Sequence, residues 1–136
     1  MSGKYYIYSF EKLEVYKSAL MLSITIKKLV ILFPESEKYD LSRQLKRSVS
    51  SIGSNISEGS GRASNFDQAH FTNIAYGSAL ESIHHLNEAK LLEYIDEDKY
   101  IELRMQLDKI INQLNALYQY QVNNKGNLKN KIKKKD

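Results

Sequence analysis

The chain has 136 residues, of which 42% are hydrophobic and 26% are charged, and its formal net charge is +4. This length favours a single domain, and the composition is that of an ordinary globular protein. Because the chain has no cysteine, disulfide frameworks and thiolate catalysis are excluded. The charge is uneven: residues 124–136 carry six lysines and one aspartate, a net +5, so the other 123 residues sum to −1.

Residues 1–9 precede the first helical pattern and are predicted to form an N-terminal arm. They lack the positively charged and apolar regions of a secretory signal peptide. The longest apolar stretch, residues 19–33, contains Lys27 and Lys28, which excludes a membrane-spanning helix. We therefore expect a cytoplasmic protein with no membrane partner.

The first predicted helix begins at Phe10 and ends at Phe33, because Pro34 disfavours helical geometry in the residue before it. At about 100° per residue, its apolar side chains fall on two nearly opposite faces. The first face is formed by Leu13, Tyr16, Leu20, Ile24 and Ile31. The second face is formed by Val15, Ala19, Leu22, Ile26, Leu29, Val30 and Phe33.

A monomeric bundle needs only one of these two faces for its core. The other face would expose a large apolar patch to water, and such patches usually mark interfaces. We therefore predict a homo-oligomer in which this helix is buried on both sides. The pattern leaves open which face meets the neighbouring subunit, and the face that begins with Val15 is taken as the candidate oligomer interface.

The second predicted helix begins at Lys38 and ends at Glu58. Gly59 and Gly61 follow it and are candidates for a left-handed C-terminal cap. Gly53 lies inside the helix and costs about 1 kcal/mol of helix propensity relative to alanine, which suggests close packing or a bend. One face of this helix is apolar, and the opposite face is small and hydroxylic. The hydroxylic face is formed by Ser48, Ser50, Ser51, Ser54 and Ser57.

Ser64 caps the start of the third predicted helix, which ends near Tyr94. The fourth predicted helix spans residues 97–122 and has a single apolar stripe, which buries against one core. The connections are short, so neighbouring helices should be antiparallel. The predicted fold is therefore all-α, an antiparallel, up-down-up-down four-helix bundle over residues 10–123, followed by a basic disordered tail over residues 124–136.

Two basic elements are candidates for binding nucleic acid. The first is a set of side chains on and after the second helix, namely Arg43, Lys46, Arg47 and Arg62. The second is the tail, which can neutralise phosphates without reading sequence. The lysines of the tail are Lys125, Lys129, Lys131, Lys133, Lys134 and Lys135. In a homo-oligomer each modest patch is repeated around one axis, and the repeated charge can attract RNA or DNA.

A metal-binding alternative depends on histidines and carboxylates of the third helix. Glu81 and His84 have the Glu-x-x-His spacing of di-iron bundles, and His85 and Glu88 lie close by. A di-metal centre needs a second such pair from another helix, and the sequence has none. We therefore expect no metal and no cofactor. Since no spacing supports a nucleophile relay, we also expect no enzymatic activity.

Several segments resemble one bacterial protein family. They are Phe10–Ala19, the helix stop at Phe33–Pro34, and Ser51–Gly59 with the sequence SIGSNISEG, which is the most specific of them. On these residues the chain resembles the four-helix-bundle proteins encoded in intervening sequences of large-subunit ribosomal RNA genes. It is also similar to the accessory variability protein of diversity-generating retroelements. Tyr16 and Gly53 stand where the family often has tryptophan and proline.

The resemblance implies a homopentamer with a central channel and no catalytic residues. For the retroelement branch it implies association with a reverse transcriptase, and with RNA or DNA through basic surfaces. The leading hypothesis is therefore a non-enzymatic, pentameric accessory protein that associates with nucleic acid, with a reverse transcriptase as a partner to test. The alternative is a structural scaffold that recruits another protein through the surface of the ring.

Overall fold

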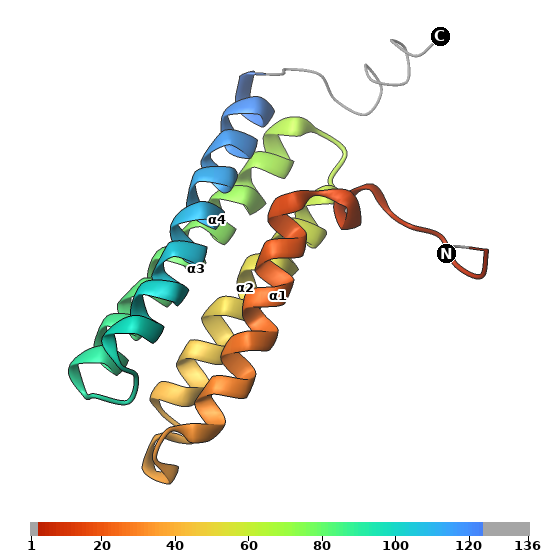
Figure 1. Ribbon diagram of the computed structural model, residues 1–136. Coiled ribbons are helices and arrows are strands. Elements are labelled where there is room, and N and C mark those ends of the chain that lie inside the picture. Colours follow the sequence, from red (N-terminus) through yellow and green to blue (C-terminus); the bar gives the residue numbers. More distant parts are fainter. Residues whose placement is uncertain (1–2, 124–136) are drawn as a thin grey trace, which may run out of the picture.

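The computed structural model describes residues 3–123 of the chain. These residues form four α-helices and no β-strand: α1 (Glu14–Leu29), α2 (Leu41–Ser60), α3 (Asn65–Leu91) and α4 (Glu97–Asn123). Consecutive helices run in opposite directions (Figure 1), so the predicted all-α, up-down-up-down bundle is confirmed. The predictions for the basic tail fall on residues outside the described part of the chain.

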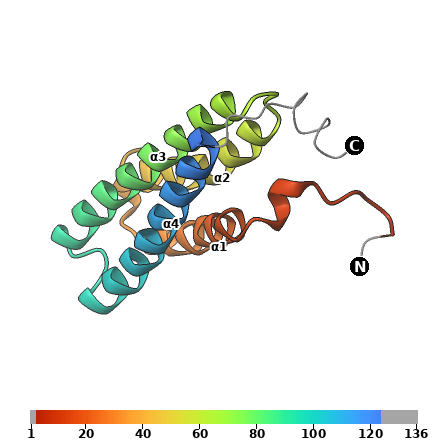
Figure 2. The ribbon, with the colours of Figure 1, turned by 90° about the horizontal axis from the view of Figure 1, so that it is seen from above.

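The helices pack around a four-sided core in which α1 and α3 lie at opposite corners (Figures 1 and 2). α2 packs against both α1 and α3, α3 also packs against α4, and the contact between α1 and α4 is the smallest. The described residues that precede the bundle extend away from it (Figure 1). Among the helices described, none combines the length and apolarity that a membrane span requires.

The first helix is shorter in the structure than the sequence pattern predicts. Ser9–Lys12 form a separate 3₁₀ turn, η1, and Leu13 after it is extended (φ −70°, ψ 131°). α1 therefore begins at Glu14 rather than at the predicted Phe10. A second turn, η2 (Val30–Leu32), ends the helical segment just before Pro34, as predicted. The loop to α2 contains a third turn, η3 (Glu35–Glu37).

The predicted left-handed cap at the end of α2 is wrong. Gly59 lies inside the helix, Gly61 ends it with φ −84°, and no glycine among the described residues has a positive φ. Gly59 is needed for a different reason, because a Cβ there would lie 2.7 Å from the Cβ of Phe71 on α3. The left-handed residue is Glu93 (φ 62°), two residues after the end of α3. The backbone N–H of Tyr94, which follows it, donates to the carbonyl of Ala89 (2.9 Å).

The predicted oligomer interface on α1 is wrong, because its residues lie in the core. The face taken as the oligomer interface is instead inside the single chain, where Ile26 is 0% exposed. The members of this face in the core are Val15, Ala19, Leu22, Ile26, Val30 and Phe33, with Leu29 packed at its edge. The opposite face is the open one, with Leu20 46% and Ile24 41% exposed. Periodicity identifies two apolar faces, but only packing against α2 and α4 decides which one is buried.

Serines join α2 to α3 in place of large apolar side chains. The hydroxyl oxygens of Ser48 and Ser82 lie 2.9 Å apart, and Ser78 donates to Ser51 at 2.9 Å. Ser48 and Ser82 are fully buried. Because short side chains let two helix backbones approach closely, we call these four residues the serine seam. Part of the predicted hydroxylic face of α2 is therefore a contact within the fold.

Candidate nucleic-acid interface

The four basic residues predicted to bind nucleic acid divide into two pairs. Arg43 is exposed and Lys46 is half-buried, and both lie near the start of α2. Arg47 and Arg62 instead contact acidic side chains. A cation in an ion pair already has part of its charge neutralised, so Arg43 and Lys46 are the stronger candidates for contacting phosphate.

The two paired arginines serve helix contacts. Arg47 of α2 forms a hydrogen-bonded ion pair with Glu81 of α3. Arg62 lies 3.2 Å from the carboxylate of Glu58, and its guanidinium lies 4.5 Å from the ring centroid of Phe71. Stacking on an aromatic ring and pairing with a carboxylate are both typical of arginine in a structural role. The Arg47–Glu81 pair joins α2 to α3, and the Arg62–Phe71 contact joins the turn after α2 to α3.

Lys46 shares a pocket with two lysines from other elements. Lys27 of α1 and Lys38, which follows η3, line the same hollow of about 230 Å³, which we call the lysine pocket. Its other lining residues are Val30, Ile31, Phe33, Pro34, Glu35 and Ser42. The carboxylate of Glu35 lies 3.9 Å from Lys38 Nζ. Three ammonium groups against one carboxylate leave the pocket with a net positive charge.

Two of these lysines, Lys27 and Lys38, were missed by the sequence analysis. Each lies on a different element from Lys46, and no spacing along the chain connects the three. The antiparallel arrangement brings the end of α1 beside the start of α2 (Figure 1). The sequence did offer one indication of this cluster. Basic residues stand at the end of one predicted helix and at the start of the next, and a short connection places these two ends side by side.

A second hollow lies between α1 and α2 and shares Lys27 with the lysine pocket. It has a volume of about 250 Å³, and we call it the α1–α2 groove. On the α1 side its lining includes Tyr16, Leu20 and Ile24 from the exposed face. On the α2 side the lining includes Ser50, Gly53, Ser54 and Ser57. Apolar side chains thus predominate on the α1 wall, beside Ser23 and Lys27, and small residues predominate on the α2 wall.

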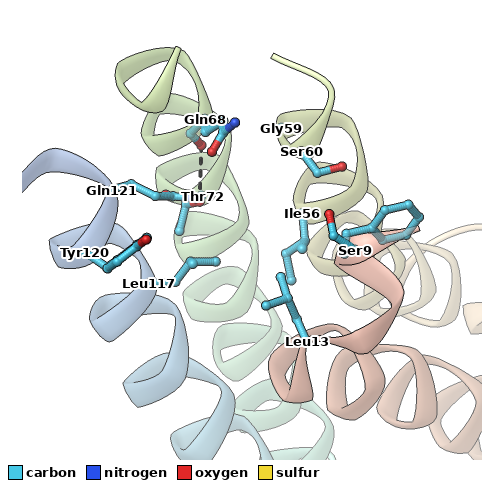
Figure 3. A pocket seen from close by; sticks show the side chains of 11 residues that line it. Ser9, Leu13, Ile56, Gly59, Ser60, Gln68, Thr72, Leu117, Tyr120 and Gln121 are labelled. Atoms are coloured by element: carbon cyan, nitrogen blue, oxygen red, sulfur yellow. Dashed lines mark hydrogen bonds between the residues drawn. The ribbon is translucent and has the colours of Figure 1, made fainter. Parts of the chain in front are cut away.

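A third pocket, of about 210 Å³, lies at the opposite end of the bundle (Figure 3). There Thr72 of α3 donates to Gln121 Oε1 of α4 at 2.7 Å, and both side chains are buried. Gln68 at the rim donates to the carbonyl of Arg62 (3.0 Å). None of the residues that line this pocket is charged. It therefore lacks the cations that a phosphate site requires.

Glu81 is the centre of a polar network between α2 and α3. Its carboxylate accepts hydrogen bonds from Arg47 and from Nε2 of His85, the latter at 3.2 Å. Burial acts to raise the pKa of Glu81, but the hydrogen bonds from His85 and Arg47 outweigh burial and lower it. The carboxylate is therefore ionised at neutral pH and remains an acceptor for both partners.

Comparison with known proteins gives a match over most of the chain. Residues 11–116 match the family described as 23S rRNA-intervening sequence protein. The chain belongs to this family. It is also similar to a protein with unknown function from the S23 ribosomal protein family of Bacteroides thetaiotaomicron, whose crystal structure has a TM-score of 0.71 and 27% sequence identity, over 77% of this chain and 95% of that chain. A search of curated proteins found no match.

The match to the 23S rRNA-intervening sequence protein family covers the helical bundle. Residues 11–116 include the lysine pocket and the α1–α2 groove, whereas residues 124–136 lie outside the match. The predicted resemblance to the intervening-sequence family is therefore confirmed. The predicted similarity to the retroelement accessory protein is not part of these findings and stays a prediction.

Proposed function

We propose that the chain is a non-enzymatic accessory protein that binds RNA through the lysine pocket and Arg43. The observation that carries the proposal is the convergence of Lys27, Lys38 and Lys46 on one hollow within the segment matched by a family named for 23S ribosomal RNA. Phosphates of a nucleic-acid backbone are the polyanion that such a set of ammonium groups fits. The tail lysines are a second, sequence-independent source of positive charge for binding RNA.

The proposal includes assembly of the chain with copies of itself through the exposed face of α1. Leu20 and Ile24 stand beside the α1–α2 groove, and a hydrophobic face of this kind is what a subunit contact buries. The occupant we propose is α1 of the next copy, which carries the same apolar residues. A contact that joins the groove of one copy to a helix of the next is a head-to-tail contact. Such contacts form a closed ring when the rotation from one subunit to the next divides evenly into a full turn. The family resemblance implies five subunits.

Assembly changes the strength of RNA binding. Lys27 lines both the groove and the lysine pocket, so each subunit contact would lie beside a pocket. A chain whose first 123 residues have a net charge of −1 attracts RNA weakly as a monomer. Repeated pockets around one axis act as linked sites, and linked sites gain affinity without any new contact.

The test is the salt dependence of binding to a structured RNA fragment, measured by fluorescence anisotropy. The triple variant Lys27→Gln, Lys38→Gln, Lys46→Gln removes the pocket charges. We expect weaker binding, and a slope of log affinity against log salt that is shallower by about two to three, because each lost phosphate contact removes close to one unit. Unchanged affinity and slope would overturn the proposal.

A charge-matched control separates the pocket from diffuse attraction. Lys17→Gln, Lys99→Gln, Lys109→Gln removes three lysines that do not line the pocket, of which Lys17 and Lys109 are exposed and Lys99 is half-buried. This control should leave the slope nearly unchanged. Equal losses in the two triple variants would mean that RNA responds to total charge and that the lysine pocket has no special role.

A structural scaffold that recruits another protein is the second candidate, and exposed apolar side chains that do not line the groove favour it. Met21 is 63% exposed and Leu32 is 80% exposed. A pull-down that recovers a protein partner after nuclease treatment, together with no detectable RNA binding, would support the scaffold instead. The same experiment tests the reverse transcriptase that the retroelement resemblance implies as a partner.

A further inference from the structure

Three metal-ligating side chains of α3 lie together outside the lysine pocket. His84, His85 and Glu88 each offer one ligand atom, and these atoms lie within 4.8 Å of one another. The sequence disfavours a di-metal centre, because such a centre needs a second pair of ligands from another helix. A mononuclear centre needs only three protein ligands and one position for water.

His85 is held in one orientation by a carboxylate. Its Nε2 lies 3.2 Å from Glu81 Oε2. An ionised carboxylate can only accept a hydrogen bond, so Nε2 carries the proton and donates. Arg47 in turn pairs with the same carboxylate and fixes its position. In a metal-bound histidine, the ring nitrogen that does not bind the metal usually donates its N–H to a carboxylate, a carbonyl or water. The contact between His85 and Glu81 has this form.

The other ring nitrogen of His85 has no partner within the described residues. Nδ1 is buried and accepts no hydrogen bond, although the residue as a whole is 9% exposed. With the proton on Nε2, Nδ1 of the neutral ring has a free lone pair. Leaving a buried acceptor unsatisfied costs about 1–3 kcal/mol, so such an atom requires an explanation. A cation bound to that lone pair supplies one.

We propose that His84, His85 and Glu88 bind one divalent cation of the zinc class, with Glu81 as a positioning residue that acts through His85. Two imidazoles and one carboxylate form a ligand set that suits Zn²⁺ or Co²⁺ better than Mg²⁺ or Ca²⁺, which prefer oxygen ligands. Ligand atoms around tetrahedral Zn²⁺ are about 3.4 Å apart, as follows from metal–ligand distances near 2.1 Å. The exposed side chains of His84 and Glu88 can close the remaining distance by changing rotamer.

The experiment is titration of the full chain, stripped of metal with a chelator, with zinc chloride in a calorimeter. We expect one Zn²⁺ per chain with a low-micromolar dissociation constant. His84→Ala and Glu88→Gln each remove an exposed ligand, so neither should disturb folding, and each should weaken binding by at least about tenfold. His70→Ala is the matched control, because His70 is also an exposed histidine of α3 but lies outside the cluster.

The role of Glu81 has its own readout. Glu81→Gln should weaken Zn²⁺ binding by about 10–100-fold, which is the usual cost of losing a carboxylate that is hydrogen bonded to a metal-bound histidine. Arg47→Gln removes the other partner of Glu81 but keeps the carboxylate, so it should change the affinity far less. Substitution of Co²⁺ for Zn²⁺ gives a visible absorption band that reports tetrahedral coordination, and this band should be lost in His84→Ala.

Three results would overturn the proposal. The first is the absence of any heat of binding at high micromolar zinc chloride. The second is binding that His84→Ala and Glu88→Gln leave unchanged. The third is an equal loss in His70→Ala, which would mean nonspecific binding to surface histidines.

Discussion

The side of α2 that faces α3 and the side that faces α1 carry similar small residues but pack differently. Toward α3, Ser48 and Ser82 are buried and hydrogen bonded at 2.9 Å, and Gly59 leaves no room for a Cβ beside Phe71. Toward α1, Gly53 has room, because the nearest atom to an added Cβ is in the Tyr16 ring at 3.7 Å. The serine seam is closed, and the α1–α2 groove is open.

A small residue therefore has no fixed structural role by itself. In the serine seam, α3 supplies its own serines opposite those of α2, so the two backbones come together. In the groove, α1 supplies one serine, Ser23, whose hydroxyl lies 3.0 Å from that of Ser50. Its neighbours on α1 are Leu20 and Ile24, and a hollow remains beside Ser54 and Ser57. The seam therefore contributes to folding, whereas the groove is a surface available to another molecule.

The largest expected effect is at Gly59. Gly59→Ala places a methyl group against the Cβ of Phe71, and overpacking should lower the free energy of unfolding by about 1–2 kcal/mol after the gain in helix propensity. Urea denaturation followed by circular dichroism measures the change. Gly61→Ala is the control, because its added Cβ would meet the Glu58 carbonyl at 3.5 Å, an ordinary contact. If both variants behave alike, the tight contact at Gly59 is not real.

The serine seam itself gives the next effect. Ser82→Ala removes a buried hydroxyl that contacts Ser48 and the carbonyl of Ser78, and it should cost about 1 kcal/mol. A double-mutant cycle with Ser48→Ala measures the coupling between the two hydroxyls. We expect the double variant to lose less than the sum of the two single losses. Strict additivity would show that the two serines are energetically independent.

In the groove, the sign of a glycine substitution should reverse. Gly53→Ala fits against Tyr16 without a clash, so the free energy of unfolding of the monomer should rise by about 0.5–1 kcal/mol through helix propensity. The same methyl group enters the α1–α2 groove and should weaken assembly. Chemical denaturation of a dilute sample, together with size-exclusion chromatography, separates the two effects. A loss of monomer stability would mean that the groove is as tightly packed as the seam.

The smallest effect on stability should come from Ile24→Lys. Ile24 is 41% exposed in the single chain, and substitutions at such surface positions usually change stability within about 0.5 kcal/mol. The added charge in an apolar contact should nevertheless dissociate the oligomer. Chemical denaturation of dilute, monomeric samples measures the stability part, and light scattering at higher concentration measures the assembly part. A large loss of stability of the dilute monomer would place Ile24 in the core rather than at an interface.

Most of the architecture could be predicted from the sequence because it depends on local signals. Pro34 ended the first helical segment, and the apolar stripe of α4 fell on one face, with Leu103 and Leu114 fully buried. The predicted glycine caps are wrong because a glycine near the end of a helix can have more than one role. Gly59 allows a close contact with α3, and the left-handed conformation is taken by Glu93, which is not a glycine. Contacts between helices decide such cases, and they are not visible along the chain.

The candidate sites were less predictable for the same reason. The two apolar faces of α1 were found, but the one taken as the interface is in the core. Both faces are apolar in sequence, and periodicity alone does not say which one the fold buries. Lys46 was found, whereas its pocket partners Lys27 and Lys38 come from other elements and meet it only in three dimensions. Arg47 was chosen for its charge, and its pairing with Glu81 across two helices required the fold.

Sedimentation velocity of the full chain at micromolar concentration shows whether the exposed face of α1 is a contact between subunits. We expect one species whose mass is a multiple of the 15.7 kDa of the chain, and its conversion to monomer by Ile24→Lys. A single 15.7 kDa species across the whole concentration range would contradict this expectation, and RNA binding would then depend on one lysine pocket alone.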